Sequence, residues 1–511
     1  MIKTSEYHDS VSLMLVARSL TGMPGVQDAA VVMGTDANKS LLKQSGLLSP
    51  EAQAATPNDL IIAVSMVGDG SNVLAEAEKL LARKQSAEET AEFRPKTIRS
   101  AVKARPDANV AILSVAGRYA ADEAWEALRR GLHVLLFSDN VSLEDEIALK
   151  TYARDHGLLL MGAGAGTAIL NGIALAFANV VPSGPVGIVS AAGTGLQEVS
   201  TLLAKDGVGI TQGIGTGGRD LKKEVGGIMF LEGLKALQAD PATEVIVLVS
   251  KPPAPEVANK VIDQVLKSQK PAVVCLLGGK ARPVVDATHV YFTTTLQEAA
   301  LTAASLAGAD IPEVKVTIAA EIEQIQQQGQ ALKTRLSSGQ KYLRGLFSGG
   351  TLCYEAQVIW RDEFRATVYS NAPLSPEEQM VDSTRSEKHT AVDLGEEEFT
   401  VGRPHPMIDN DLRIRRILQE ARDPEIAVLM LDVVIGYGAH DDPAAELAPV
   451  LRQARQIAAE AGRNLIVIAS VTGTEQDPQG LSRTTNLLET AGVVVLKSNA
   501  AAARLAGYIV C

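Results

Sequence analysis

Two short turns of small residues stand where a strand pattern gives way to a helix pattern. One reads Ser190-Ala-Ala-Gly-Thr194 and the other Ser348-Gly-Gly-Thr351. The first turn of a helix has unpaired backbone N–H groups at the positive end of the helix dipole, and small side chains let an anion approach them. The sequence therefore predicts a phosphate or carboxylate cradle, and the alternative is a tight turn that merely caps a helix. The predicted cradle residues are Ser190, Gly193, Thr194, Ser348, Gly349, Gly350 and Thr351.

Charged and polar residues in other loops could complete such a site. Arg219 could clamp an anion with two parallel hydrogen bonds. Because a histidine ordinarily titrates near neutral pH, His405 and His440 are candidates for acid–base chemistry, and Asp409 could work beside them. Lys251 could neutralise charge, although it could equally be a solvated surface residue, and His405, between two prolines, could be a rigid turn residue. The catalytic candidates are His405, Asp409, His440 and Lys251, with Arg219 as a phosphate ligand.

Glycine-rich segments follow the strands that would carry these residues. Open α/β sheets bind ligands at the carboxyl ends of their strands. We therefore expect substrate loops at "GIGTGGRDLKKEVGG" and "DVVIGYGAHDDP". Their candidate residues are Gly215, Gly217, Gly218, Asp432, Gly436 and Gly438.

The elements that position these residues repeat along the chain. "GIVSAAGTGLQEV" at 187–199 is answered by "GLFSGGTLCYEAQV" at 345–358, and "DPATEVIVLVS" at 240–250 by "DPEIAVLMLDV" at 423–433. Two further pairs follow in the same order. Strands alternating with helices favour parallel sheets with right-handed crossovers. The sequence thus predicts a multidomain α/β protein with Rossmann- or flavodoxin-like domains and a duplicated unit.

The same pattern gives predicted domain limits. We expect five parts in this order: a small α/β domain, a Rossmann half, the first copy of the unit, a polar connecting helix or linker, and the second copy. The second copy carries a charged insertion near 361–400 that we expect to be a surface excursion. The limits are 1–95, 96–182, 183–312, 313–341 and 342–511.

Composition excludes several classes of protein. The net charge of −12 and the lack of a Lys/Arg cluster argue against nucleic-acid binding. The apolar stretches are too short for a membrane span, and the start has no signal-peptide pattern, so we expect a cytoplasmic protein. The cysteines Cys275, Cys353 and Cys511 are far apart, which favours reduced thiols, and no metal site is expected.

Several motifs resemble a known family. "SGPVGIVSAAGTGLQEVS", "GIGTGGRD" and "KPAVVCLLGG" resemble the ligase domain of the succinyl-CoA synthetase α subunit, and residues 342–511 resemble the matching β-subunit domain. Residues 110–180 resemble half of its CoA-binding domain. With "HPMID" at 405–409, the chain resembles the FdrA family from end to end.

The chain also departs from the synthetase pattern. The loop that carries the phosphorylated histidine in those enzymes is shortened to "GGKARPVVDATHV", whose only histidine is His289 at the start of the next strand. Residues 1–85 replace the G-x-G-x-x-G half of the CoA domain and are too few for an ATP-grasp domain. We therefore expect no phosphohistidine and no cofactor, neither CoA nor nucleotide.

The FdrA resemblance implies a multisubunit transferase of purine catabolism. It implies an oxamate carbamoyltransferase of allantoin degradation, which converts oxalurate and phosphate to oxamate and carbamoyl phosphate with companion transcarbamylase subunits. The cradle would hold phosphate, and its N–H groups would stabilise the developing oxyanion. The alternatives are an acyl-CoA synthetase component, which would use CoA or a nucleotide, and a non-catalytic scaffold subunit.

Overall fold

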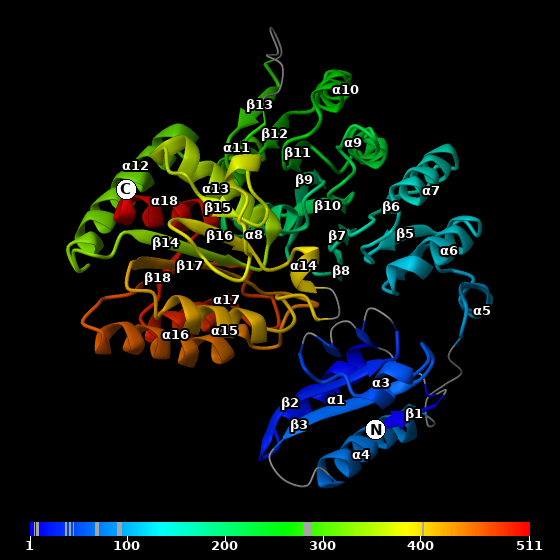
Figure 1. Cartoon of the computed structure of the whole chain (residues 1–511). Coiled ribbons are helices and arrows are strands. Elements are labelled where there is room, and N and C mark those ends of the chain that lie inside the picture. Colours follow the sequence, from blue (N-terminus) through cyan, green and yellow to red (C-terminus); the bar gives the residue numbers. More distant parts are fainter. Residues whose placement is uncertain are drawn as a thin grey trace. The chain divides into compact units, whose positions relative to one another are not determined.

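The computed structural model describes residues 1–4, 6, 10–35, 38–39, 42–43, 45–66, 71–88, 95–279, 288–400 and 403–511. Contacts along the chain divide it into two compact units, and Figure 1 shows the elements of both. One unit comprises residues 1–104 with 397–404, and the other comprises 105–396 with 405–511. No helix in the described ranges combines the length and the apolar character that crossing a membrane requires.

The first unit is a small α/β domain, as the strand signals predict. Its antiparallel sheet has the order β1-β3-β2. Buried Leu20 of α1, Ile62 of β3 and Ala77 of α4 belong to one apolar core. The elements are β1 (Ile2–Lys3), α1 (Ser10–Thr21), β2 (Val26–Met33), α3 (Pro50–Ala54), β3 (Leu60–Met66), α4 (Ser71–Glu88), α5 (Ile98–Ala104) and α14 (Glu397–Thr400).

The second unit begins with the predicted Rossmann half. Three parallel strands, in the order β4-β5-β6, are joined by helices. A hairpin, β7-β8, follows and pairs through β7 with β10 of the next sheet, antiparallel to it. The elements are β4 (Val110–Leu113), α6 (Gly117–Leu128), β5 (His133–Leu136), α7 (Leu143–Asp155), β6 (Leu160–Met161), β7 (Thr167–Leu170) and β8 (Ile173–Ala176).

The first copy of the duplicated unit is a parallel sheet between helices. Its strands have the order β13-β12-β11-β9-β10. The strands β11 and β12 are fully buried, mostly aliphatic runs, which is typical of parallel sheets covered on both faces. The elements are β9 (Ser183–Ser190), α8 (Gly193–Lys205), β10 (Ile210–Gly215), α9 (Ile228–Ala239), β11 (Val245–Ser250), α10 (Pro255–Val265), β12 (Ala272–Leu276), β13 (Val290–Thr293) and α11 (Leu296–Leu306).

The second copy has the same strand order. Its sheet reads β15-β16-β14-β17-β18-β19, so that both copies follow the flavodoxin-like order 2-1-3-4-5 once edge strand β15 is set aside. The order expected from the duplication is confirmed. The elements are β14 (Tyr342–Phe347), α13 (Gly350–Phe364), β15 (Tyr369–Ser370), the 3-10 turn η1 (Pro376–Glu378), β16 (Thr390–Asp393), α15 (Asp411–Glu420), β17 (Ile426–Val434), α16 (Pro443–Glu460), β18 (Ile466–Thr472), α17 (Leu481–Thr490), β19 (Val494–Leu496) and α18 (Asn499–Val510).

One sequence expectation needs correction. The segment 361–400 is not only a surface excursion, because it contains β16, which is wholly buried beside β14. Four residues, "TAVD", between charged stretches are too short to stand out as a strand. The polar segment 313–341 forms α12 (Val314–Lys333), which packs on α18, where Gly329 lets the backbones approach closely (Figure 1).

Buried glutamates join the two copies in a pseudo-symmetric way. Glu198 of α8 accepts a hydrogen bond from the backbone N–H of Asn499, in the first turn of α18. Glu355 of α13 accepts one from the N–H of Leu296, in the first turn of α11. Each glutamate thus satisfies an otherwise unpaired donor at a helix start of the other copy. Burial raises the pKa of Glu355 to about 7.

Candidate functional site

The two predicted turns lie against each other. α8 begins at Gly193 and α13 at Gly350. The backbone N–H of Thr351 donates to Thr194 Oγ1 at 3.3 Å, and a Cβ atom on Gly349 would lie 2.8 Å from Thr194 Cγ2. The positive ends of two helix dipoles therefore meet at one place, which favours negative charge there.

The second turn is nevertheless occupied by the protein's own carboxylate. The N–H groups of Ser348 and Gly349 donate to Asp432 at 2.8 and 2.7 Å, and the Ser348 hydroxyl donates at 3.1 Å. Asp432 is fully buried and also bonded to Arg413. The prediction that Ser348 and Gly349 offer these donors to phosphate is therefore wrong. Asp432 lies on β17 inside the core rather than in a substrate loop.

In the described part of the chain, no acid bonds to the first turn in this way. Val249 occupies the position that Asp432 has in the second copy, by alignment of the two repeats. The Ser190 hydroxyl bonds within the turn, accepting from Ala192 N and donating to Ala192 O, so it is not a free donor as predicted. A Cβ atom on Gly193 would meet nothing closer than Thr167 Oγ1, at 3.6 Å. The α8 turn is therefore open in the sense that no carboxylate of the described chain fills it and a methyl group on Gly193 would fit without a clash.

Lys251 and an unpredicted acid, Asp393, flank the start of α13. A Cβ atom on Gly350 would overlap Asp393 Oδ2 and would lie 3.4 Å from Lys251 Nζ. Lys251 Nζ also lies 5.7 Å from the centre of the Tyr354 ring. Burial raises the pKa of Asp393 to about 7, and the charge of Lys251 opposes that rise. The only sequence signal for Asp393 is an acid at the end of a short apolar stretch.

His405 lies next to Asp393. A Cβ atom on Gly395 would lie 2.8 Å from His405 Nε2 and 3.2 Å from Asp393 Oδ1. Burial, assisted by the positive charge of Arg413, lowers the pKa of His405 to about 4. Nδ1 accepts the N–H of Met407 at 3.2 Å, which places the proton of the neutral ring on Nε2. His405 is therefore a hydrogen-bond donor at neutral pH, not a nucleophile.

Two other catalytic candidates make structural contacts. The Asp409 carboxylate accepts the N–H of Asp411 at 2.8 Å, at the start of α15. His440 Nδ1 accepts the N–H of Asp442 at 3.0 Å, and its Nε2 lies 3.1 Å from Glu446 Oε2. The N–H of His440 also donates to the carbonyl of Met407. Asp409 and His440 therefore stabilise the loops on either side of His405.

Arg219 is engaged away from the turns. It bonds to the carbonyl of Val141 and to Glu146 of α7, at 2.8 and 2.7 Å. Glu146 in turn pairs with Lys150, which bonds to Asp220. The prediction of a phosphate clamp is therefore corrected, since Arg219 belongs to an ionic network that joins the Rossmann half to the first copy.

Most of the loop glycines serve close packing. A Cβ atom on Gly217, at φ +87°, would lie 2.6 Å from Ala163 O, and one on Gly215 would overlap Thr167 O. Gly436 and Gly438 also have positive φ and press against residues 176–179. Gly218 and Gly438 are exposed. The positive φ and the close approaches give Gly215, Gly217, Gly436 and Gly438 a structural reason, and the expectation of substrate loops stays a prediction.

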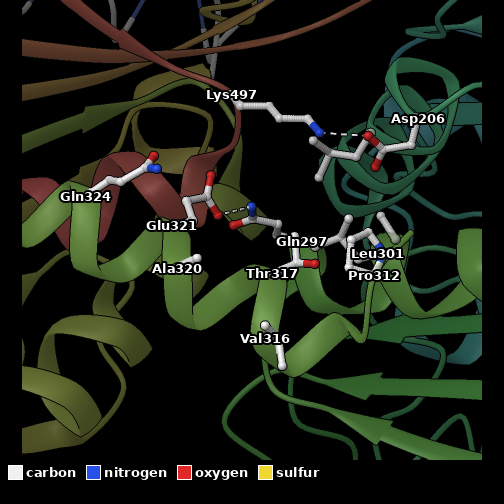
Figure 2. Close-up of a pocket in the computed structure, with 12 residues that line it drawn as sticks. Asp206, Gln297, Leu301, Pro312, Val316, Thr317, Ala320, Glu321, Gln324 and Lys497 are labelled. Atoms are coloured by element: carbon white, nitrogen blue, oxygen red, sulfur yellow. Dashed lines mark hydrogen bonds and ion pairs between the residues drawn. The ribbon is translucent and has the colours of Figure 1, made fainter. Parts of the chain in front are cut away.

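A pocket of about 480 Å³ lies at the other end of α8 (Figure 2). Its apolar wall includes Leu202, and its polar residues pair with one another. Lys497 bonds to Asp206 at 2.7 Å and Gln297 to Glu321 at 2.5 Å. These four side chains are thereby engaged with one another, whereas Lys251 and Asp393 lie at the helix starts.

Replacing Asp393 by asparagine should stabilise the protein at high pH. The folded protein binds the Asp393 proton with a pKa of about 7, against 3.8 for an ordinary aspartate. The protonated Asp393 therefore contributes fully to the free energy of unfolding below about pH 4. This contribution is lost as the pH rises through about 7, and the loss reaches about 4 kcal/mol. Asp393→Asn removes this loss. Urea unfolding at about pH 5 and about pH 8 should show a variant advantage that grows with pH. The contribution of Glu355 cancels in the difference, and an advantage independent of pH would contradict the assignment.

The comparisons with known proteins agree with a ligase-like core. Residues 346–509 match the family model described as CoA-ligase, and residues 1–96 match the model described as AllF, heavy metal-associated domain. Heavy metals prefer thiolate ligands, and residues 1–96 contain no cysteine. Among the described residues, no group of three or more His, Cys, Asp and Glu side chains is arranged to hold a metal ion.

Three similar proteins differ in their identity to this chain and in how much of it they cover. YahF of Escherichia coli K12, an uncharacterized protein, is 44% identical over 100% of this chain and 98% of its own length. Subunit alpha 1 of an Archaeoglobus fulgidus ADP-forming succinate–CoA ligase is 28% identical over 45% of this chain and 79% of its own. Methanothrix soehngenii ATP citrate lyase, solved with citrate and coenzyme A, is 22% identical over 43% of this chain and 38% of its own, with a TM-score of 0.33. The chain carries a CoA-ligase domain and belongs to the family of YahF.

Proposed function

We propose that this chain is a subunit of an acyl-CoA ligase-like enzyme that transfers a small acyl group between phosphate and CoA. The observation that carries the proposal is the meeting of the α8 and α13 starts, flanked by Lys251 and Asp393, inside a chain with a CoA-ligase domain. CoA is then a substrate, in place of the expectation that neither CoA nor a nucleotide is used.

The site residues suit an acyl phosphate. Its phosphoryl group would lie at the open α8 turn, near Gly193 and Thr194, where backbone N–H groups and the dipole favour an anion. Lys251 would neutralise a second negative charge. The Nε2–H of His405 would donate to the acyl carbonyl oxygen, as a neutral imidazole can without releasing a proton. These donors would stabilise the charge that develops on the oxygen during attack.

The relatives support a small carboxylic acid as substrate and a companion chain as partner. The Archaeoglobus relative is a subunit of a succinate–CoA ligase that forms ADP. By analogy, a second chain would bind the nucleotide and make the acyl phosphate. This chain would then catalyse the exchange between acyl phosphate and CoA.

The half-reaction can be tested without the companion chain. The full-length protein is mixed with CoA and either acetyl phosphate or succinyl phosphate, and thioester formation is followed by its ultraviolet absorbance. We expect enzyme-dependent thioester with at least one acyl phosphate. Gly193→Val, which fills the open turn, should abolish it while leaving the unfolding transition in place. No thioester with any small acyl phosphate would overturn the proposal.

Carbamoyl transfer is a second candidate. The FdrA resemblance suggests phosphorolysis of oxalurate to oxamate and carbamoyl phosphate, in allantoin breakdown with companion subunits. The neutral Nε2–H of His405 favours it, because a donor ring suits direct attack by phosphate and does not serve as a phosphate acceptor. Carbamoyl phosphate formed from oxalurate and phosphate, in a reaction that CoA does not change, would select this candidate over the first.

A further inference from the structure

We propose that Asp393 is the acid–base residue of this site, taking the thiol proton of CoA as the acyl group is transferred. The inference rests on the proposed function and names a residue that carries out its proton transfer. Its basis is the position of the carboxyl group, which is buried at the start of α13, beside Lys251, where that helix start meets the start of α8.

The backbone around Asp393 fixes the direction of its side chain. Asn371 bonds to both the N–H and the carbonyl of Asp393, each at 2.9 Å. The N–H of Gly395 holds Oδ1 at 2.9 Å. Oδ2 is left on the side of Gly350, where a Cβ atom would overlap it. The second oxygen is therefore directed at the helix start, where the reacting groups would lie.

The groups that face Asp393 come from four elements. Lys251 follows β11, and its positive charge favours the ionised carboxylate. Asp432 on β17 and Glu396, just after β16, favour the protonated acid. Cys353 lies on α13, and the neutral His405 lies beyond Gly395. Burial dominates this balance and raises the pKa of Asp393 to about 7, which lets the group both accept and release a proton near neutral pH.

The proton and electron changes balance in the proposed step. The CoA sulfur forms a bond to the acyl carbon, and its proton passes to Asp393 Oδ2. The bond from the acyl carbon to the phosphate oxygen breaks, and phosphate leaves with that electron pair. Asp393 then returns the proton to water or to phosphate. In the reverse direction, protonated Asp393 gives its proton to the departing thiolate.

The test compares two buried acids with similar pKa values. Asp393→Asn should lower kcat for thioester formation from acyl phosphate and CoA by about 10²- to 10⁴-fold, the range for loss of a general base. Glu355→Gln is the matched control, because Glu355 is also buried with a pKa of about 7 but bonds to Leu296 and Asn499 instead. This control should retain wild-type kcat.

A second variant tests the acid–base role of Asp393 if Asp393→Asn does not fold. The pH profile of kcat in the wild type should have an inflection near pH 7, and Lys251→Met should move it to higher pH, because the charge that favours the carboxylate is gone. An active wild type whose rate survives Asp393→Asn, or whose inflection stays unchanged in Lys251→Met, would overturn the role of Asp393. A wild type inactive with every acyl phosphate would instead overturn the proposed function, and the inference with it.

Discussion

Asp432→Ala should lower the free energy of unfolding by about 3–5 kcal/mol, the cost of leaving a buried charge without its partner. Arg413 is 2% exposed and has Asp432 as its ion-pair partner. The change also removes the acceptor of the Ser348 and Gly349 N–H groups. Urea unfolding with far-ultraviolet circular dichroism measures the loss.

A double variant separates the charge from the shape. Arg413→Met with Asp432→Leu removes both charges and keeps most of the volume, and such replacements of buried pairs are often neutral or better. It should recover much of the stability lost in Asp432→Ala. If Asp432→Ala loses less than about 1 kcal/mol, the second turn is not held by its internal carboxylate, and an anion site there would again be open.

Gly350→Ala should reduce kcat for thioester formation about 100-fold. Gly193→Ala should leave kcat within about twofold and should instead raise the KM for acyl phosphate, because its methyl group stands at the proposed phosphoryl site. The new methyl group on Gly350 would overlap Asp393 Oδ2, and displacing a reacting group by about 1 Å costs on that order. The methyl group on Gly193 would meet nothing closer than 3.6 Å. Initial rates of thioester formation measure both.

These two alanine variants are matched by the duplication itself. Both glycines stand at the first position of equivalent helices, so that helix propensity affects them alike. Equal losses in both would indicate a general effect on the helix starts. Equal, unchanged rates would show that Asp393 is not needed where the structure places it.

Repeats and local pattern were enough to predict the architecture. Four matched segments predicted two copies with one strand order, and the turns at Gly193 and Gly350 were predicted as helix starts. These features depend on short stretches of sequence, in which a buried strand, small residues and a helix pattern follow directly.

The hydrogen-bond and ion-pair partners of the polar groups could not be predicted in this way. Asp432 fills the second turn from a neighbouring strand 84 residues away, and Arg219 turns to Glu146 in another domain. Asp393 ends a strand too short to recognise. Each of these contacts is set by how separate elements pack, so residue type and spacing in one stretch do not specify it.

Phosphate-dependent release of CoA from succinyl-CoA is a direct test of the proposed acyl exchange between phosphate and CoA, because it needs no nucleotide and no companion chain. The full-length protein is incubated with succinyl-CoA, with and without phosphate, and free thiol is measured with a thiol-reactive dye after subtracting the exposed Cys511. We expect release that requires phosphate, persists in Glu355→Gln and is lost in Asp393→Asn. Release that does not depend on phosphate, or none with any small acyl-CoA while oxalurate is split by phosphate, would contradict it.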